Sequence, residues 1–536
     1  MKGKKVLALL LAGVMGITGL AGCGAKNTET DNAENQGTKA ESGAEASTGS
    51  SSEEAEVPDV EIWNANIGYK AVEKDGELYN FYKDLIGVGI VQPYVEWNGG
   101  NTYQQQLNLK IAAGEMPDMF LPYNGMEKSL IESGSLLDLT DLLPEMAPNL
   151  WESVPEEVWD VMRSYDPTGE GRIYTIPNLI DYNLMSGLIR QDWLDNLGLS
   201  MPTTQDEFVA VLEAFKMQDP NGNGTADEIP TGGRQEVKWM DTFFAMYGLA
   251  MWEGDPQWDI YDGELTYAAV TPNMKDALAF MNELYEKGLM DPETLLNDKA
   301  AWEGKIFADK VGVAYHWSET ANSWVESIKS ATGAEADWAV LPAISAEGYE
   351  AFYTTKKIKG IGYVLKNTDD QKTIEAYMKV LNAYGDKDLW KTMYLGVEGM
   401  HSHEVNGNLV RKEDDMTVME NIVLAPYNDV ATVEFKVDLY KEMSTGGREW
   451  AMKQSIRNIE ESQKYGKTIA GDGIPSSVYD EYPDIMNKTL YIEYASKIIT
   501  GEYEIDKFDE FVEKWYATGG EAVTKAAREW YSATQQ

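Results

Sequence analysis

Few of the residues that carry metal, redox or nucleophilic chemistry occur in this sequence. Its 536 residues include one cysteine and three histidines, so neither an intrachain disulfide nor a cysteine-based metal cluster can form. The HEXXH pattern of zinc proteases is absent, because the pair His403-Glu404 is followed by VNG. GIGYVL starts like a dinucleotide-binding fingerprint but has Leu365 at the third glycine position, and no Walker A motif occurs. These absences argue against metalloprotease, dinucleotide-dependent and ATPase activities.

Basic residues are scarce relative to acidic ones. The chain has 45 lysines and arginines against 89 aspartates and glutamates, and its formal net charge at pH 7 is −44. Binding to nucleic acid needs a basic surface, and polyanionic substrates would be repelled at long range. We therefore predict no nucleic-acid partner, and a neutral ligand fits best. A local pocket of arginine or lysine could still override this repulsion within a Debye length of about 8–10 Å.

The N-terminal apolar run is shorter than the roughly 20 residues that a membrane-spanning helix needs. A basic start, MKGKK, precedes this run, VLALLLAGVMGITGL, and the small residues LAGC follow it, which is the layout of a secretory signal. LAGC resembles the lipobox of bacterial lipoproteins. That resemblance implies that residues 1–22 are a signal peptide and that Cys23 is acylated, for example with palmitate. We therefore predict attachment to the cell membrane through the lipid on Cys23, with the protein facing the extracellular side.

Residues 23–57 are expected to form the acylated cysteine and a disordered tether. From residue 24 to 57 the chain has no aromatic residue and no leucine, isoleucine or phenylalanine, so it cannot bury enough apolar surface to fold. Tryptophan, tyrosine and methionine become frequent from Pro58 onward. This remaining length exceeds a single typical core and predicts two lobes. Alternating strand and helix patterns at its start predict parallel α/β organisation.

The clearest helix signal lies in LSMPTTQDEFVAVLEAFKMQ. Thr204 and Glu207 form a predicted capping box at its start. The segment KVGVAYHWSETANSWVESI predicts a strand, a short aromatic turn and then a helix capped by Ser318. One apolar face of the first helix is expected to be core, and it consists of Phe208, Val211, Leu212 and Phe215. In IRQDWL we expect structural roles, an ion pair and a helix-anchoring ring, for Arg190, Asp192 and Trp193.

The stretch DPNGNGTADE, which follows this helix, has the spacing of a calcium loop. Side-chain oxygens recur at its first, third and fifth positions, a glycine at the sixth permits a sharp turn, and the seventh offers a backbone carbonyl. Position twelve is Pro230 where an EF-hand has a bidentate glutamate, so this is not an ordinary EF-hand. A hydrophilic turn without metal is the alternative, because the same residue types favour turns. The candidate ligands are Asp219, Asn221, Asn223, Thr225, Asp227 and Glu228.

The order of motifs resembles the extracellular solute-binding lipoproteins of bacterial carbohydrate ABC transporters, the group that includes maltose-binding protein. The matching pieces are IAAGEMPDMF, GRIYTIPN, IRQDWLDNLGLSMPTTQDEF, DPNGNGTADEIP, YEKGLMDPE, VGVAY before HWSE, LGVEGMHSHEVNG and IITGEYEIDKFDEFV. They run in sequence over nearly all of residues 58–536. The larger calcium-containing oligosaccharide binders are the most similar, and this resemblance favours Ca²⁺ over the metal-free turn as a structural clamp.

The resemblance implies a two-lobed periplasmic-binding-protein-like fold of type II, with a ligand cleft between α/β lobes that a multi-stranded hinge joins. Residues 58–179 plus 345–400 would form lobe 1, and residues 180–344 plus 401–536 would form lobe 2. The protein would capture an oligosaccharide, close around it by hinge motion, and deliver it to the permease subunits of an ABC importer. It is expected to act as a monomer and not as an enzyme, so no catalytic residue is assigned.

A sugar-binding cleft needs flat apolar faces and fixed polar groups. Trp317 follows the strand VGVAY at the place where maltose-binding protein carries a stacking tryptophan. Each candidate taken singly is more often a packing residue than a ligand contact. The candidates at strand ends and crossovers are Trp63, Asn64, Asp181, Tyr182, Asn183, His316 and Trp317. Trp239, soon after the calcium loop, and Glu398 and His401, in the segment LGVEGMH that is expected to face the hinge, complete the set.

Two other functions compete with this interpretation. A secreted, lipid-anchored glycoside hydrolase would need two facing carboxylates, and a chain with 89 acidic residues neither supports nor excludes such a pair. A surface adhesin or peptide-binding lipoprotein would share the N-terminus, but it would not predict the α/β motif order.

Overall fold

The computed structural model describes residues 57–64, 71–95, 101–123, 125–180, 182–400, 402–405, 408–411, 432–442, 444, 447–479 and 481–535. Residues 56–536 form one compact unit. Cys23, the predicted signal peptide, nearly all of the predicted tether, Asp181 and His401 lie outside the described residues. In the described part of the chain, no helix is long and apolar enough to cross a membrane.

The first sheet has five strands in the order β2-β1-β3-β14-β4. Its first three strands pair in parallel, as the strand and helix pattern predicted, and two helices connect them. The strand β14 arrives later in the sequence and pairs antiparallel with both β3 and β4, so the complete sheet is mixed. The elements are β1 (Val60–Trp63), α1 (Glu77–Ile86), β2 (Ile90–Val91), α2 (Asn101–Ala112), β3 (Met119–Phe120), β4 (Thr175–Leu179) and β14 (Ile358–Leu365).

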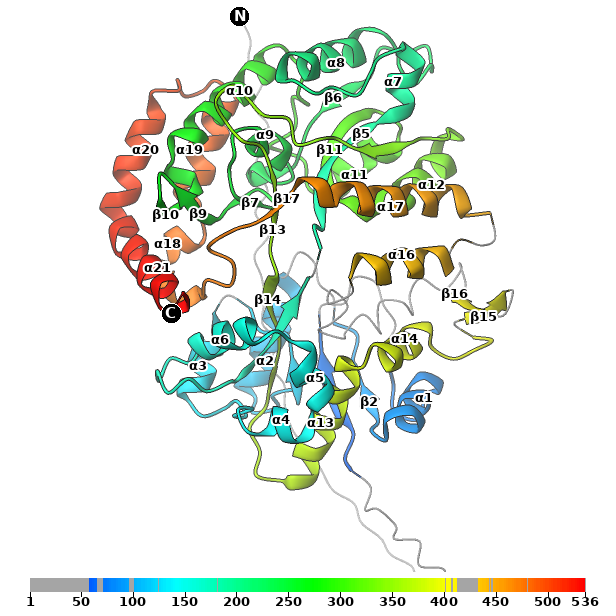
Figure 1. Cartoon of the computed structure of the whole chain (residues 1–536), viewed down its shortest axis with the longest axis vertical. Coiled ribbons are helices and arrows are strands. Elements are labelled where there is room, and N and C mark those ends of the chain that lie inside the picture. The colour runs from blue at the N-terminus through cyan, green and yellow to red at the C-terminus, as the bar shows by residue number, and fades with distance from the viewer. Residues whose placement is uncertain are drawn as a thin grey trace, which may run out of the picture. The chain divides into compact units, whose positions relative to one another are not determined.

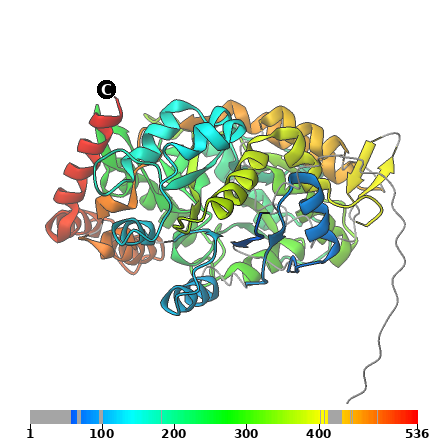
Figure 2. The same ribbon diagram turned by 90° about the horizontal axis from the view of Figure 1, so that it is seen from below.

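Short helices and one long helix pack against this sheet. The long helix α13 (Gln371–Gly385) contacts α4 and α5, and Figure 2 shows α13 beside these early helices. The contact is close because Gly385 has no side chain: a Cβ there would lie 2.2 Å from the backbone nitrogen of Leu150. The other helices are α3 (Met126–Glu132), α4 (Leu142–Met146), α5 (Pro148–Ser153), α6 (Glu156–Ser164) and α14 (Lys387–Leu395).

The second sheet has four strands in the order β12-β5-β11-β6. Its central strand β11 pairs antiparallel with β5 and parallel with β6. The strands are β5 (Met185–Arg190), β6 (Ile229–Thr231), β11 (Val311–Trp317) and β12 (Trp338–Val340). The helices of this part are α7 (Gln191–Leu197), α8 (Gln205–Met217), α9 (Asp241–Met246), α10 (Pro272–Glu286), α11 (Lys299–Phe307) and α12 (Ala321–Thr332).

Two capping predictions have different outcomes. The predicted N-cap of α8 is confirmed: the Thr204 side chain accepts a hydrogen bond from the Glu207 N–H at 3.2 Å, and the predicted apolar face is buried. Glu207 itself accepts from the N–H and hydroxyl of Thr203. The prediction that Ser318 caps the next helix is wrong, because a 3₁₀ turn, Ser318–Thr320, precedes α12 and the Ser318 hydroxyl is buried against that of Ser186.

C-terminal helices complete the structure. The helix α17 (Glu449–Ser462) packs on α12 and β12, and Figure 1 shows α17 next to α12. The helix α19 (Thr489–Ile499) contacts both α10 and α20 (Lys507–Trp515). The remaining helices are α16 (Val433–Glu442), α18 (Pro483–Met486) and α21 (Glu521–Thr534). Small paired strands are β7 (Met251–Trp252) with β8 (Asp255–Pro256), β9 (Trp258–Tyr261) with β10 (Glu264–Tyr267), β13 (Tyr353–Thr355) with β17 (Gly466–Thr468), and β15 (Ser402–Val405) with β16 (Asn408–Arg411).

The chain passes between the two sheets twice over the described residues. It leaves the first sheet after β4 and enters the second at β5, and it returns from β12 to β14. The strands of the first sheet fall within residues 58–179 and 345–400, and those of the second fall within 180–344. The lobe boundaries themselves stay a prediction.

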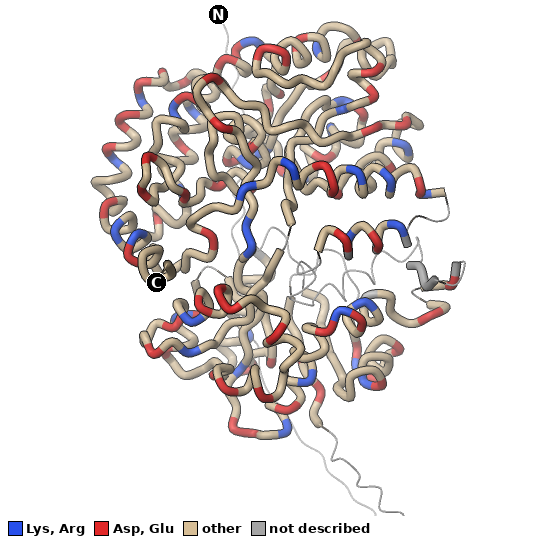
Figure 3. Tube along the Cα trace, viewed as in Figure 1, with Lys and Arg blue, Asp and Glu red and all other residues tan. Residues whose placement is uncertain are grey.

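Figure 3 shows acidic residues on helices throughout the described part of the chain, with basic residues interspersed.

Candidate functional site

Six rings, which we call the aromatic cluster, gather around the end of β11. His316 and Trp317 are the last two residues of that strand. The ring of Trp239 stacks on that of His316 with centroids 4.6 Å apart and an interplanar angle of 19°. Helices α11 and α12 and strand β12 supply the others, and successive ring pairs lie 5.2–6.3 Å apart. The cluster consists of Trp239, Trp302, His316, Trp317, Trp324 and Trp338.

His316 is held as a neutral ring within this cluster. Its Nδ1 lies 2.7 Å from the Thr320 hydroxyl, and four tryptophan rings surround it. Burial lowers the pKa of His316 to about 3, because the charged form would lose its hydration there. Both His316 and Trp317 are half-buried, so each keeps part of its surface open to solvent. At neutral pH the His316 ring is therefore uncharged.

A strained turn presents Trp239 to the cluster. Glu236, Val237 and Trp239 have positive φ angles of 62°, 63° and 61°, which side chains other than glycine rarely adopt. The hairpin of β7 and β8 braces this turn, since a Cβ at Gly254 would lie 2.5 Å from the Cα of Lys238. Gly254 also donates its N–H to the buried Asp241 carboxylate at 3.1 Å. Backbone strain of this kind concentrates at functional sites.

Tyr182 and Asn183 are placed in the interior at the first crossover between the sheets. Asn183 is 3% exposed. It donates from its side chain to the Ser462 carbonyl at 2.9 Å and accepts from the Thr355 hydroxyl at 3.1 Å, so it joins the crossover to α17 and β13. Tyr182 is also buried, within the core that contains Trp239. This geometry gives Asn183 a structural role, and its contact with a ligand stays a prediction.

The candidates from the first sheet lie in another core. Trp63 is buried with Phe120 and Val364, and its indole donates to Glu61 at 2.6 Å. Asn64 donates to the Tyr363 hydroxyl at 2.8 Å. Glu398 is exposed and forms an isolated backbone bridge with Ser402. The structure therefore brings together the rings of three of the predicted ligand residues, Trp239, His316 and Trp317.

The loop after α8 turns on its own side-chain oxygens. The Asp219 carboxylate accepts the N–H groups of Asn223 and Gly224 at 3.1 and 3.0 Å, and the Asn221 side chain accepts from Asn223 at 3.0 Å. Asp227 pairs with Lys310 at 2.7 Å. Gly222 and Gly224 have positive φ angles of 69° and 79°, which the turn requires. These contacts agree with both the calcium loop and the metal-free turn.

Glu228 distinguishes the loop from an ordinary turn. Both of its carboxylate oxygens are buried, and neither has a hydrogen-bond partner in the described part of the protein. Burial, together with the charges of Asp219 and Asp227, raises the pKa of Glu228. An orphaned carboxylate is costly unless something else compensates its charge. The donor set of the loop, consisting of carboxylate, amide and carbonyl oxygens, is the set that Ca²⁺ prefers, so the residues present fit this cation.

A comparison with known proteins decides the family. The family model described as bacterial extracellular solute-binding protein matches residues 87–387, which is more than half of the chain. The protein belongs to this family. Its members bind solutes outside the cytoplasm, and the solute-binding interpretation of the motif order is thereby confirmed.

Relatives of this solute-binding protein are similar over most of its length. Lipoprotein LipO of Bacillus subtilis strain 168 is 24% identical, with 82% of this chain and 86% of LipO aligned. The polygalacturonan/rhamnogalacturonan-binding protein YtcQ of the same organism is 22% identical over 98% of this chain and 99% of YtcQ. The fructooligosaccharide ABC transporter substrate-binding protein FusA of Streptococcus pneumoniae is 28% identical over 54% of this chain and 55% of FusA.

Solved structures of solute-binding proteins share the fold, which confirms the predicted fold class. An extracellular solute-binding protein from Bifidobacterium longum subsp. infantis aligns with a TM-score of 0.69 at 19% identity, over 90% of this chain and 99% of that one. The alginate-binding protein AlgQ2, solved without calcium ion, aligns with a TM-score of 0.65 at 18% identity over 89% and 98%. FusA of S. pneumoniae in complex with kestose aligns with a TM-score of 0.62 at 21% identity over 89% and 99%.

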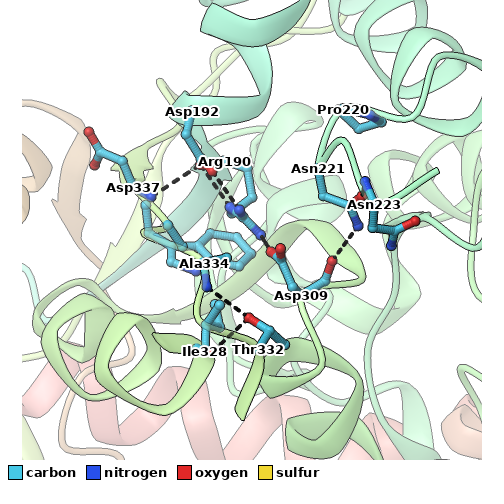
Figure 4. A network of polar contacts seen from close by, with 12 residues as sticks. Arg190, Asp192, Pro220, Asn221, Asn223, Asp309, Ile328, Thr332, Ala334 and Asp337 are labelled. Carbon is cyan, nitrogen blue, oxygen red and sulfur yellow. Dashed lines mark hydrogen bonds and ion pairs between the residues drawn. The ribbon is translucent and has the colours of Figure 1, made fainter. Parts of the chain in front are cut away.

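In this solute-binding protein, a buried ionic network lies between the candidate calcium loop and the second sheet. Arg190, 1% exposed, pairs with Asp192 at 2.5 Å and with Asp309 (Figure 4). The centroid of the Trp193 ring lies 4.7 Å from its guanidinium. The Asn221 side chain donates to the Asp309 carbonyl at 2.9 Å, which joins the loop to this network. The predicted structural roles of Arg190, Asp192 and Trp193 are confirmed.

The sequence analysis did not identify three members of the aromatic cluster or one residue that packs beside it. Trp302, Trp324 and Trp338 occur in helix and strand patterns that signal only burial. Trp252 packs against the same core from the β7–β8 hairpin. A separate surface groove of about 690 Å³ runs along α21 and is lined by none of the predicted site residues. The aromatic cluster contains three of the predicted ligand residues and is the candidate ligand site on that ground.

Proposed function

We propose that this solute-binding protein captures an oligosaccharide at the aromatic cluster and delivers it to an ABC importer. The observation that carries the proposal is the half-buried pair His316 and Trp317 at the end of β11, with Trp239 stacked behind. Pyranose rings present flat C–H-rich faces, and flat aromatic surfaces with adjacent polar groups complement them. The named ligands of FusA and YtcQ, which are oligo- and polysaccharides, support this ligand class.

Closure of two lobes would retain the bound sugar. The chain passes between its sheets at β4–β5 and at β12–β14, and such crossovers are where a hinge would lie. The membrane partners would be the permease subunits of the importer, which the closed form would engage. The acylated Cys23 would hold the protein at the outer face of the cell membrane, as the lipobox predicts and as the name of LipO supports. The protein would work as a monomer without catalytic turnover.

We also propose that the loop from Asp219 to Glu228 binds a structural Ca²⁺. Asp219, Asn221, Asn223 and Glu228 would supply side-chain oxygens, Thr225 a backbone carbonyl, and Asp227 a further carboxylate after exchange with Lys310. No group of three or more His, Cys, Asp or Glu side chains among the described residues is arranged as a metal site. The proposed set relies instead on mixed oxygen donors. The structures described as AlgQ2 without calcium ion and as an EF-hand mutant of FusA support such a site.

Binding and product analysis together test the main proposal. The soluble form, residues 24–536, should melt at a higher temperature with one class of oligosaccharide, because a ligand that binds only the folded state stabilises it. The sugar should be recovered at its original length. Trp317→Ala should lower the affinity about tenfold or more, the scale of a lost sugar-stacking ring. Trp530→Ala, a partly buried tryptophan on α21, is the matched control and should retain wild-type affinity.

Two outcomes would contradict the proposal. Shorter sugars after incubation would indicate a hydrolase. If no oligosaccharide in a broad neutral and acidic panel raised the melting temperature, the ligand would belong to another class, such as a peptide.

A further inference from the structure

A third segment of the chain, residues 466–476, contacts the surroundings of both sheets. It begins with β17, which pairs in parallel with β13, and β13 in turn contacts β5 of the second sheet. Ala470 donates its N–H to the Asp259 carboxylate, and Gly471 donates to the Trp258 carbonyl, each at 3.0 Å. Trp258 is buried in the core that contains the apolar face of α8. The start of this segment is therefore fixed to the part of the chain that contains the second sheet.

The end of the segment is fixed to the part that contains the first sheet. Tyr165, which follows α6, donates its hydroxyl to the Gly473 carbonyl at 3.2 Å, and Ser476 donates to the buried Glu127 carboxylate on α3 at 3.2 Å. Gly473 has a φ angle of 77°, and a Cβ there would lie 2.7 Å from Cγ1 of Val161. The absence of a side chain thus lets the segment approach α6 closely. The contacts change from one part to the other at residue 472.

Asp472 joins this segment to both crossovers. One carboxylate oxygen, Oδ2, accepts the N–H groups of Lys357 at 2.6 Å and Ile358 at 3.1 Å, where the return crossover leaves β13 and enters β14. The carbonyl of Lys357 accepts the N–H of Ile180, just after β4 on the first crossover, at 2.9 Å. The backbone of Lys357 therefore lies between the other two connections and is hydrogen-bonded to each of them.

The geometry of this carboxylate restrains the backbone that it binds. A single oxygen can accept two successive N–H groups only while both point toward it, so rotation at Lys357 or Ile358 would break at least one bond. Hydrogen bonds to an ionised acceptor are about twice as strong as neutral ones. The other oxygen of Asp472 is buried and has no hydrogen-bond partner in the described part of the chain. Burial raises the pKa of Asp472, and the charge of Lys356 opposes that effect.

We propose that Asp472 is a positioning residue of the hinge, which holds the three connections in the arrangement described here and thereby sets the equilibrium between open and closed lobes. This inference rests on the proposed function, because it takes the lobes to move about the crossovers. Hinge motion is absorbed by a few residues that change their φ and ψ angles, and Asp472 restrains two such residues at the point where β13 passes into β14. The carboxylate would act on the lobes and not on the sugar.

Distance measurements between two labels test the proposal without any sugar. The soluble form, residues 24–536, has no cysteine, because Cys23 is the only one in the chain. Lys372→Cys on α13 and Glu213→Cys on α8 place spin labels at exposed positions on helices that contact the first and second sheets. In pulsed electron paramagnetic resonance, Asp472→Ala should change the ratio of short to long inter-label distances about tenfold or more, the scale of one charge-assisted hydrogen bond. Asp472→Asn keeps an acceptor oxygen and should change it less.

Matched variants separate the hinge from general stability. Asp386→Ala removes a carboxylate oxygen that also accepts two N–H groups, those of Asp388 and Leu389 at 3.0 and 2.9 Å, but at the start of α14. It should leave the distances unchanged. Gly473→Ala should shift them as Asp472→Ala does, because its Cβ would push the segment away from α6. Gly171→Ala is its control, since Gly171 has a φ angle of 71° and a Cβ there would meet no atom within 4 Å.

Three results would overturn the proposal. Unchanged distances in Asp472→Ala and Gly473→Ala would show that this contact does not restrain the lobes. An equal shift in Asp386→Ala would show a general loss of stability, and a shift in Asp472→Asn as large as in Asp472→Ala would show that the two N–H bonds are not the cause. The labels report without sugar, so these results leave the proposed function untouched, whereas a failure of all oligosaccharides to bind would refute that function and leave the measured distances to decide the role of Asp472.

Discussion

Glu228 offers the sharpest test of the calcium loop, because one substitution should have opposite effects with and without the cation. Glu228→Gln removes a buried carboxylate charge that has no partner among the described residues. Without calcium, this should leave the melting temperature unchanged or raise it, because repulsion from Asp219 and Asp227 is relieved. With calcium, the variant should lose most of the stabilisation that the wild type gains.

The expected gain can be estimated from mass action. Free calcium at 100 times the dissociation constant stabilises the folded state by about 2.7 kcal/mol. At an unfolding entropy of roughly 2.1 cal/mol/K per residue, a unit as long as residues 56–536 unfolds with about 1 kcal/mol/K. The wild-type melting temperature should therefore rise by about 3 °C, which differential scanning calorimetry resolves, and the rise should be largely absent in Glu228→Gln.

The pH dependence gives a second measurement on the same residue. The pKa of Glu228 is raised in the folded protein above its ordinary value of 4.5, so the folded state binds more protons than the unfolded state just above that value. Without calcium, this residue therefore destabilises the protein progressively as pH rises through that window. Without calcium, the free energy of unfolding of Glu228→Gln should exceed that of the wild type by an amount that grows as the pH rises. With calcium, the wild type should be the more stable of the two.

A matched control and two outcomes decide the question. Glu213→Gln replaces an exposed glutamate on α8 and should show the full calcium response of the wild type. A wild-type melting temperature that did not respond to calcium would refute the metal site. A full response in Glu228→Gln would show that the cation binds without this carboxylate.

Two further substitutions test the supports of the site. Arg190→Met should lower the free energy of unfolding by about 3–5 kcal/mol in denaturant titration, because it leaves the Asp309 charge without its buried partner. Arg163→Met, at an exposed ion pair, is the control and should lower it by less than about 1 kcal/mol. Equal losses in the two variants would contradict a structural role for the buried ion pair. Gly254→Ala should cost more stability than Gly263→Ala and should also weaken sugar binding, because both glycines have positive φ but a Cβ at Gly254 would strike Lys238. Similar stabilities and affinities for the two glycine variants would refute a role for the hairpin in placing Trp239.

The neutral state of His316 has a consequence for the proposed ligand site. His316 stays neutral well below physiological pH, so this ring does not change its charge as the environment acidifies.

The sequence by itself determined the features that depend on local order along the chain. The capping threonine and apolar face of α8, the parallel start of the first sheet and the ion pair in IRQDWL follow from spacing over a few residues, because helix and strand periodicity and neighbouring charges act locally. The motif order indicated the solute-binding family, and the loop spacing identified the oxygen donors from Asp219 to Glu228.

Only the tertiary structure decided which of the candidate residues meet. Trp239 joins His316 through a strained turn whose positive φ angles depend on the β7–β8 hairpin, and no local pattern signals that brace. The sequence predicted Asn183 as a ligand contact just as it did Trp317. In the structure, the Asn183 amide instead hydrogen-bonds to α17 and β13, whose residues are more than 170 positions away in the sequence. The buried carboxylate oxygens of Glu228, which have no hydrogen-bond partner among the described residues, likewise could not be predicted from the local sequence. Burial and pairing are properties of long-range contacts, and a single sequence records them only indirectly.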